Sequence, residues 1–438
     1  MSHNTDTMPT KVHRDSKLGE IPDGWSTPKI SEVFQFINTT SFSRDQLNYD
    51  EESDLFYIHY GDIHATYKKP LLDFEIETKV PKLNSDVVLP NSVQYLKDGD
   101  VIIADASEDY EGVGEAIEIK NLNGKAAISG LHTFAFRDLD SKTVPGFRTY
   151  IFKNPNVKKA LKIIATGSKV YGISKGNIQK FKIVLPPLPE QQKIAQILAT
   201  WDVAINKQEA LMEEKQLQKK ALMQQLLTGK KRFAGFKDEW QLIKIKDISS
   251  LLTKGTTPSS VGFEFLDTGI NFIKAENITK DGFIDIKSTP KISIECNNSL
   301  KRSILKVDDI LFSIAGTLGR TAIVKSKDLP ANTNQALSII RINRGHLSYI
   351  NFQLNTEIID KYILKMVSVG AQPNLNLQQV GNIEIPFPSA KEQQKIAEVL
   401  TIADNEITVL KQQLQKIKTQ KQGLMQQLLT GKIRVNKN

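Results

Sequence analysis

The nine residues LMQQLLTGK occur twice in this chain, at 222–230 and again at 424–432. Each copy ends a longer matching segment, 190–230 and 392–432, in which 20 of 41 positions are identical at a constant offset of 202. Chance does not produce such a match, and a period near 200 residues is far longer than that of solenoid repeats. The sequence therefore predicts a duplicated pair of domains.

Each 41-residue segment has the composition of a long helix. Gln, Lys, Glu, Leu and Ala dominate, Pro is absent, and Gly229 and Gly431 stand where a helix would end. About 39 residues would form a rod of roughly 58 Å. Apolar residues follow a heptad seam, at seven of ten positions in the first copy and nine of ten in the second. Besides Met212 and Ala403, the apolar residues of the seam are Ile194, Leu198, Trp201, Ile205, Leu222, Leu226, Ile396, Leu400, Ile407, Leu410, Leu414, Ile417, Leu424 and Leu428.

Such a seam needs a partner, because a lone helix would expose a long apolar stripe. The other copy is the nearest candidate, and two equivalent units pair most simply about a pseudo-twofold axis. We therefore expect an antiparallel intramolecular coiled coil. The alternative, in which each helix packs on its own globular domain, leaves part of the seam uncovered. Lys421 interrupts the second seam, and in a homodimer of the C-terminal half, about residues 233–438, we expect it to be the weak point because it would meet an apolar stripe.

The regions before the two helices mix strand and helix patterns, which indicates two α+β domains. Runs at 54–58, 100–103, 269–273 and 309–314 predict strands, and 157–166 and 350–369 predict helices. The expected organisation is a polar tail (1–21), a first globular domain (22–188), a first long helix (189–230), a second globular domain (231–388), a second long helix (389–432) and a C-terminal tail (433–438).

Composition is that of a globular protein, with 40% hydrophobic and 24% charged residues in 438. No run of about 18 apolar residues is present, and the polar N-terminus lacks the apolar core of a signal peptide, so we expect a soluble, cytoplasmic protein away from membranes. The single cysteine, Cys296, excludes an internal disulfide framework and a cysteine-based zinc site.

Charge points to an anionic partner. The net charge is +9, and residues 141–189 hold ten Lys or Arg and no Asp or Glu. A solvated basic face is the simpler explanation, but 49 residues without an acid favour a surface that binds a polyanion.

Catalytic patterns are missing from the sequence. No phosphate-binding loop, dinucleotide fingerprint or amino-methylation signature is found, and Gly316–Arg320 lacks the Lys and hydroxyl of a nucleotide loop. The six His residues do not show metal-ligand spacing. An acidic cluster could bind a divalent ion, although a solvated loop is the favoured interpretation; it consists of Asp105, Glu108, Asp109, Glu111 and Glu115. We expect no catalytic residues and no metal site.

From Pro22 to Lys432 the chain resembles the specificity subunits of type I restriction–modification systems. The two LMQQLLTGK copies carry the resemblance, together with LPPLPEQQ at 185–192 and the stretch 309–320. A departure is the two additional residues before Glu392, compared with the first half.

The resemblance implies two target-recognition domains, each of which reads one part of an interrupted DNA site, with the helices as a spacer. It also implies that two methyltransferase subunits bind the chain and that restriction subunits join through them. S-adenosylmethionine, ATP and Mg²⁺ would then belong to those partners, and this chain would bind none of them and catalyse nothing.

Candidate DNA contacts follow from residue chemistry. Phosphate contacts need cations, and base edges are best matched by forked or polar side chains. The phosphate candidates are Lys158, Lys159, Lys162, Lys169, Lys175 and Lys180. The base-edge candidates are Arg44, Tyr60, His64, Ser168 and Tyr171 in the first domain and Asn332, Asn334, Gln335, Gln372 and Asn374 in the second. Each could equally be an ordinary polar surface residue.

Two other classes of protein remain as alternatives. A coiled-coil scaffold that binds only proteins would not need the acid-free basic run. A fused enzyme that modifies and cuts DNA would need methyltransferase and nuclease signatures.

Overall fold

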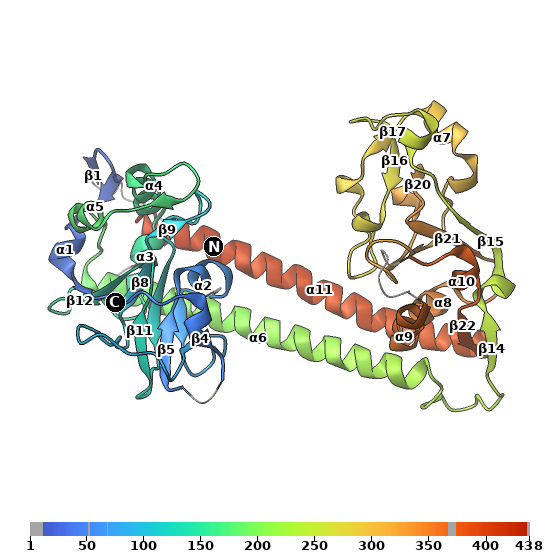
Figure 1. Ribbon diagram of the computed structural model, residues 1–438, viewed down its shortest axis with the longest axis horizontal. Coiled ribbons are helices and arrows are strands. Elements are labelled where there is room, and N and C mark those ends of the chain that lie inside the picture. Colours follow the sequence, from blue (N-terminus) through green and yellow to red (C-terminus); the bar gives the residue numbers. More distant parts are fainter. Residues whose placement is uncertain (1–11, 51–52, 68, 367–373, 436–438) are drawn as a thin grey trace, which may run out of the picture. The chain divides into compact units, whose positions relative to one another are not determined.

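The computed structural model describes residues 12–50, 53–67, 69–366 and 374–435 (Figure 1). The chain forms two compact units, one made of residues 1–208 with 413–438 and the other of 209–412. Each unit contains a globular part and a portion of each long helix. The boundaries between the units therefore fall inside the helices, because each globular part packs against the beginning of one helix and the end of the other.

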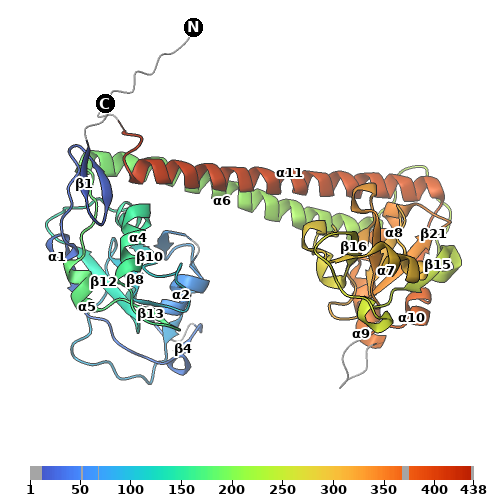
Figure 2. The ribbon, with the colours of Figure 1, turned by 90° about the horizontal axis from the view of Figure 1, so that it is seen from above.

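Helix α6 spans Leu188–Leu226 and helix α11 spans Ala390–Leu429, with 39 and 40 residues. At 1.5 Å per residue each is about 58 to 60 Å long. Gly229 and Gly431 follow them in the left-handed region, with φ of 70° and 66°, as expected for glycines that end helices. The two long helices predicted from the repeat are confirmed, and they lie side by side (Figures 1 and 2).

The ion pairs between the helices show that they are antiparallel. In the first unit Lys421 Nζ of α11 lies 2.5 Å from Asp202 of α6. In the second unit Lys219 Nζ lies 2.5 Å from Asp404, and Lys215 Nζ lies 2.7 Å from Glu406. Residue numbers rise along α6 as their partners fall along α11, which confirms the antiparallel pairing.

In the intact chain Lys421 does not meet an apolar stripe. Its ammonium pairs with Asp202 and also lies 5.9 Å from the centre of the Tyr150 ring. Lys219, its equivalent at an offset of 202, pairs with Asp404 and lies 5.6 Å from the Phe352 ring. In both halves of the repeat, the lysine at this position therefore pairs with an aspartate and lies near an aromatic ring.

The seam residues lie on the helix faces that contact the partner helix or the globular parts. All fourteen are buried or partly buried, and Ile194, Leu198 and Leu400 are fully covered. In the first unit Ile194 and Leu198 share a hydrophobic cluster with Leu428 and Leu429. In the second unit Leu226 and Leu227 join Ile396 and Leu400.

The first globular part has two main sheets. One has the order β3 (Phe34–Ile37), β12 (Thr133–Asp138), β8 (Val101–Ala104), β10 (Ala116–Lys120) and β6 (Leu71–Asp73). The other has the order β11 (Ala126–Ser129), β5 (Leu55–Ile58), β7 (Lys82–Leu83) and β4 (Leu47–Asn48). Short elements complete it: hairpin β1 (Val12–Asp15) and β2 (Gly19–Pro22), paired strands β9 (Ala106–Ser107) and β13 (Tyr171–Gly172), and helices α1 (Ile30–Val33), α2 (Tyr60–Ala65), α3 (Arg148–Lys153), α4 (Pro155–Ile164) and α5 (Lys175–Lys180).

The second globular part repeats this plan. A sheet runs in the order β15 (Ser249–Lys254), β21 (Leu337–Ile342), β18 (Ile310–Ser313) and β19 (Thr321–Ile323), and a smaller one in the order β17 (Lys291–Ile292), β16 (Ile270–Ile273) and β20 (Ala331–Thr333). Strands β14 (Gln241–Lys244) and β22 (Glu384–Phe387) pair separately, and the helices are α7 (Ile294–Ser299), α8 (Leu347–Gln353), α9 (Glu357–Met366) and α10 (Leu377–Gly381).

The predicted α+β class and strand positions agree with these elements, but one predicted helix is interrupted. Residues 350–369 were expected to be one helix. The structure has α8 and α9 instead, separated at 354–356, and residues 367–369 lie outside the described part. Leu354 N and Asn355 N still bond back to the end of α8, and Thr356 accepts the first N–H groups of α9, so the two helices meet at a turn.

The two halves share a buried Asp–Arg ion pair beside the central strand of the larger sheet. Asp100, just before β8, forms a bidentate pair with Arg137 of β12, with N–O distances of 2.9 and 2.7 Å. Asp309, just before β18, pairs with Arg341 of β21 at 2.7 and 2.8 Å. Each carboxylate also accepts the backbone N–H three residues earlier. These charge-assisted bonds satisfy two buried aspartates. Both aspartates lie in segments of similar sequence, LKDGDVI at 96–102 and LKVDDIL at 305–311.

A second shared feature ties the end of each long helix to the beginning of the other; we call it the clasp. In the first clasp Arg434 donates to both oxygens of Glu190 at 2.8 and 2.9 Å, and Trp25 Nε1 donates to the same carboxylate at 2.9 Å. In the second, Arg232 and Trp240 bind Glu392 in the same way, at 2.9, 2.7 and 3.0 Å.

The clasp carboxylates are buried, with Glu190 5% and Glu392 1% exposed. The two clasp glutamates are 202 residues apart, and so are Arg232 and Arg434, so the clasp follows the repeat. A buried charge needs a full set of partners. Each clasp therefore holds the segment that follows one long helix against the start of the other long helix.

Among the helices that the structure describes, none is long and apolar enough to cross a membrane.

Candidate nucleic-acid interface

Strand register gathers polar residues at one edge of the first globular part. Strands β5 and β11 are parallel and end opposite each other, at Ile58 and Ser129. Strand β8 ends at Ala104, opposite Thr133 at the beginning of β12. The residues that follow these ends must therefore lie together. We call Tyr60, His64, Asp105, His132 and Tyr171 the first recognition edge.

Aromatic contacts hold this edge together. The Tyr60 ring centre lies 4.7 Å from that of His59, 5.3 Å from His132 and 6.4 Å from His64. Tyr171, on the strand paired with β9, meets Tyr110 edge-on at 5.2 Å. The structure thus brings together three of the predicted residues, Tyr60, His64 and Tyr171. All three are partly exposed.

Arg44 serves first as a structural partner. Its guanidinium makes two bonds, of 2.9 and 3.0 Å, to the carboxylate of Asp62 in α2, which is almost fully buried. The arginine is still about half exposed. Burial lowers the pKa of the neighbouring His59, and the charge of Arg44 lowers it further. Arg44 therefore positions α2, and only its remaining N–H groups face outward.

Ser168 lies in the loop between α4 and β13. Two backbone bonds between Thr166 and Gly172, of 2.9 and 2.8 Å, close this loop. Ser168 and Lys169 are both exposed at its tip. The loop therefore presents a hydroxyl and an ammonium next to Tyr171.

The second globular part has the equivalent edge. Strands β16 and β20 end opposite each other at Ile273 and Thr333, and Asn334 and Gln335 follow directly. Asn374 forms a bridge with Ala315 after β18, as Gly172 does with Ala106 in the first half. We call Lys274, Asn334, Gln335 and Asn374 the second recognition edge.

Two of the side-chain amides at the second edge already accept hydrogen bonds within the chain. Gln335 Oε1 accepts the Thr257 hydroxyl at 2.6 Å, and Asn334 Oδ1 accepts the Ala336 N–H at 3.1 Å. Gln335 and Asn374 are exposed and Asn334 is partly exposed. Gln372, another predicted base-edge residue, lies outside the described residues.

The structure excludes Asn332 as a base-reading residue. It is fully buried in β20. Its amide donates to Asn297 Oδ1 at 2.9 Å and to Leu300 O at 3.2 Å, and its oxygen accepts Thr333 N–H at 2.8 Å. These bonds join the small sheet to α7, so Asn332 has a structural role.

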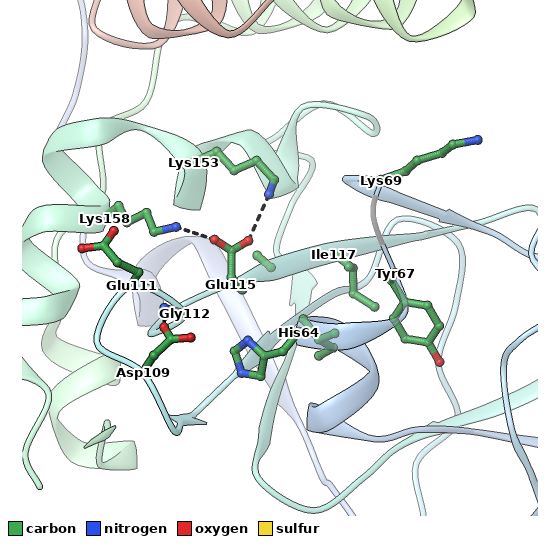
Figure 3. Close-up of a pocket in the computed structure, with 12 residues that line it drawn as sticks. His64, Tyr67, Lys69, Asp109, Glu111, Gly112, Glu115, Ile117, Lys153 and Lys158 are labelled. Carbon is green, nitrogen blue, oxygen red and sulfur yellow. Dashed lines mark hydrogen bonds and ion pairs between the residues drawn. The ribbon is translucent and has the colours of Figure 1, made fainter. Parts of the chain in front are cut away.

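Two of the predicted phosphate-binding lysines are also committed to internal partners. Lys162 Nζ lies 2.6 Å from Glu111, and Lys158 pairs with Glu115, which Lys153 also contacts at 3.2 Å. Figure 3 shows Lys153 and Lys158 both pointing toward Glu115. Burial works to raise the pKa of the Glu115 carboxyl, but the two lysines outweigh it and hold that pKa below its ordinary value.

A cavity of about 400 Å³ is lined by Glu111, Glu115, Lys153 and Lys158 together with His64, Tyr67 and Asp109 (Figure 3). The expectation that the acidic cluster is a solvated loop therefore needs correction at Glu115, which is largely covered and pairs with two lysines, but not at Glu111, whose side chain is 83% exposed although it pairs with Lys162. Within 12–50, 53–67, 69–366 and 374–435, no group of three His, Cys, Asp or Glu residues could hold a metal ion.

The other predicted phosphate-binding lysines are exposed: Lys159, Lys169, Lys175 and Lys180. Lys175 Nζ lies 5.6 Å from the Phe36 ring centre. Residues 141–189 contain no acid, but acidic residues from other segments pair with some of their lysines in the folded chain. The exposed lysines of this run carry the remaining positive charge.

Sequence reasoning did not place Asp105, His132 or Lys274 at the DNA interface; Asp105 was considered only as part of an acidic cluster. Asp105 and Lys274 each directly follow a strand end, and His132 directly precedes β12 at the end of the turn between two strands; these positions were the available signal. His132 has a φ of 56°, which is unusual for a residue other than glycine. Lys274 Nζ lies 4.9 Å from the Phe265 ring and lines a cavity of about 450 Å³ with Lys287 and Lys291.

Comparison with known proteins identifies the class to which this arrangement belongs. The family model of the type I restriction modification DNA specificity domain matches the chain twice, at residues 22–213 and 237–419. Together the matches cover most of the chain, and each spans one globular part and much of the following long helix. The chain belongs to this family.

Curated relatives and solved structures agree with this assignment. The chain is 25% identical over 435 residues to the type I restriction enzyme MjaVIII specificity subunit of Methanocaldococcus jannaschii, covering 95% of this chain and 94% of that one. It is 27% identical over 266 residues to the EcoBI specificity subunit of Escherichia coli, covering 55% of each.

The fold is similar to that of the type I system S subunit from M. genitalium, with a TM-score of 0.53, 13% identity, and 98% of this chain and 100% of that one covered. A chain from a structure titled for complex assembly and conformational transition of the type I R-M system has a TM-score of 0.59, with 16% identity and 94% and 99% covered.

Proposed function

We propose that this chain is the DNA sequence-specificity subunit of a type I restriction–modification complex and that it binds an interrupted, two-part DNA site. The observation that carries the proposal is the pair of equivalent recognition edges, one in each half of a duplicated chain. A chain with two equivalent edges that carry different side chains is suited to bind a DNA site with two different parts.

The chemistry of the edges supports DNA as the ligand. The first presents imidazole, phenol and hydroxyl groups and the second presents amides and a lysine, which can match donors and acceptors in the major groove. The exposed Lys159, Lys169, Lys175 and Lys180 supply charge for phosphate contacts, which would make binding steeply salt-dependent.

The long helices are proposed to set the gap between the two parts of the site and to bind two methyltransferase subunits. Exposed apolar side chains on both helices support a protein partner: Val203, Leu211 and Leu217 on α6, and Ile402 and Val409 on α11. Restriction subunits would join through the methyltransferases. S-adenosylmethionine, ATP and Mg²⁺ would bind to those partners, and this chain would supply no catalytic group.

A domain exchange tests the division of labour. Residues 26–188 are replaced by the matching segment of a family member with a different target, and the methylome of cells that carry the complete system is sequenced. One half of the methylated site should change, while the other half and the gap stay the same. The reciprocal exchange at 241–387 is the matched control and should change only the other half. A single exchange that alters both halves, or the gap, contradicts the proposal.

The non-catalytic role has a separate test. The purified chain, incubated with labelled S-adenosylmethionine and target DNA, should transfer no methyl group, and activity should appear when methyltransferase subunits are added. Methyl transfer by the pure chain would overturn this part of the proposal.

A further inference from the structure

The turn between β11 and β12 is held rigidly at the first recognition edge. Gly130 N–H donates to Ile58 O at 2.9 Å, and Leu131 N–H donates to the buried Tyr57 hydroxyl at 2.8 Å. Thr133 Oγ1 donates to Gly130 O at 2.6 Å. A Cβ at Gly130 would collide with the Tyr57 ring, so only glycine fits. The turn therefore holds its exposed member, His132, in one place.

His132 is fixed in an unfavourable backbone conformation. Its φ of 56° is uncommon outside glycine, and strain of this kind persists where the surroundings determine it and often marks functional sites. Asp105 holds the residue twice, because its N–H donates to His132 O at 3.0 Å and its carboxylate lies 3.4 Å from His132 Nδ1. Tyr60 meets the imidazole edge-on.

This arrangement turns the other ring nitrogen outward. The His132 side chain is 51% exposed, and its Nε2 makes no hydrogen bond within the described part of the chain. With Nδ1 held by a carboxylate, a neutral imidazole carries its proton on Nδ1 and offers Nε2 as an acceptor. Once protonated, the same Nε2 becomes a donor.

We propose that His132 reads a base of the first half-site and that the preferred base depends on its protonation. As a donor, Nε2 matches the guanine N7 and O6 acceptors. As an acceptor, it matches the amino groups of adenine or cytosine. This inference rests on the proposed function and names a chemical switch within the same site.

The groups that face His132 come from two further elements. Asp105 follows β8, and its carboxylate lies 3.4 Å from His132 Nδ1, whereas His59, which precedes α2, is a second imidazole whose own pKa is lowered in part by His132. Tyr60 of α2 lies between His132 and His64. Burial raises the pKa of Asp105, and His132 acts to lower it.

The second half supplies an internal control. By strand register, Ala336 occupies the position of His132, and Ile314 occupies that of Asp105. Neither of these two residues titrates, so the equivalent turn of the second edge lacks the histidine–carboxylate pair. A change of base preference with pH should therefore be confined to the first half-site.

The test uses the full chain assembled with methyltransferase subunits and a DNA library randomised at both half-sites. Bound DNA is selected at about pH 6 and about pH 8. The ratio of guanine to adenine or cytosine at one position of the first half-site should rise by about tenfold at the lower pH. The second half-site should not change.

Two variants test the assignment independently. His132→Asn places a residue that tolerates positive φ and does not titrate, so the dependence on pH should disappear while both half-sites are still selected. Asp105→Asn removes the carboxylate that favours the charged imidazole, so the midpoint of the preference change should move to lower pH.

The outcomes separate the two levels of the proposal. A wild-type complex that selects both half-sites but shows no change with pH overturns the role of His132 and leaves the proposed function intact. A pH-dependent preference that persists unchanged in both variants has the same consequence. An assembled complex that selects no two-part site at either pH contradicts the proposed function itself.

Discussion

Lys158 and Lys159 are neighbours in the sequence, yet the structure gives them different surroundings. Lys158 pairs with Glu115, which is 43 residues earlier, whereas Lys159 is exposed. A lysine that is neutralised inside the protein releases fewer counterions when DNA binds. The exposed lysines should therefore account for more of the salt dependence than the paired ones.

Replacing Lys159, Lys169 and Lys180 with Ala should lower the slope of log affinity against log salt by up to about 3, because each phosphate contact contributes nearly one. The measurement is a salt titration of DNA binding by the assembled complex. The matched control replaces Lys153, Lys158 and Lys162, which should reduce the slope less and destabilise the first unit, since Glu115 would lose both partners. A larger loss of slope in the control would show that DNA displaces these ion pairs.

Glu118 predicts a dependence of stability on pH. Burial raises the pKa of this carboxyl to about 7, although the N–H groups of Gly146 and Thr149 oppose the rise. A folded-state pKa above the unfolded value gives stability that is present below about pH 4.5 and lost as the pH rises through about 7. The loss should be up to about 3 kcal/mol.

The test compares urea unfolding of wild type and Glu118→Gln at about pH 5 and about pH 8. Wild type should lose stability over this interval relative to the variant, whatever the absolute stability of the variant. Parallel pH profiles for the two proteins would show that the carboxyl stays charged in the folded state.

Individual contacts were the hardest part to predict. Asn332 and Asn334 are two residues apart in a polar segment, and the sequence does not say which lies in a buried strand. Strand register decides it, because Asn332 is inside β20 and Asn334 follows it. Lys158 and Lys162 were misjudged for a related reason, since their acidic partners come from a segment more than 40 residues earlier.

Elements were more predictable than contacts. The ends of α6 and α11 follow from composition, proline and glycine, which act locally. The strands at 101–104 and 310–313 follow from short apolar runs after matching Asp residues. The break between α8 and α9 falls at Asn355 and Thr356, residue types that favour helix boundaries, but the apolar pattern continues across it and predicted one helix.

The clasp allows a prediction at the level of the helices. Arg434→Ala should destabilise the first unit by about 3 kcal/mol, because Glu190 stays buried without its cation. Amide hydrogen exchange should show the loss at the start of α6 and the end of α11, and not in the second unit. Arg232→Ala is the matched control and should have the mirror-image effect.

The double variant Arg434→Ala with Glu190→Gln distinguishes a buried charge from lost packing. The introduced glutamine is neutral and can still accept the Trp25 N–H, so the double variant should be more stable than Arg434→Ala alone. Equal stability of the two would mean that the carboxylate is solvated once Arg434 is gone.

At the scale of the whole molecule, the repeat predicts that the second half can pair with itself. In two copies of residues 233–438, Arg434 of one copy would meet Glu392 of the other, and Lys421 would meet Asp404. Both pairs reproduce contacts seen in the intact chain. We therefore expect an antiparallel homodimer, which with methyltransferase subunits should recognise an interrupted palindrome of the second half-site.

Residues 1–232 should dimerise more weakly. Lys215, which pairs with Glu406 in the intact chain, would meet Ala204 at the equivalent position. Sedimentation at protein concentrations on the order of ten micromolar should find the C-terminal fragment dimeric and the N-terminal fragment largely monomeric. A C-terminal fragment that stays monomeric would mean that the repeat has diverged too far for self-pairing.

The clasp also fixes the order in which a ribosome can complete the two units. Arg232 and Trp240 are synthesised before Glu392. The second clasp can therefore form soon after the beginning of α11 leaves the ribosome. The first unit waits for Leu428, Leu429 and Arg434, and Arg434 also donates to the backbone oxygen of Asp23, 411 positions earlier. The unit whose globular part is translated first therefore completes its folding last. A chain released a few codons early would leave the first unit without its clasp.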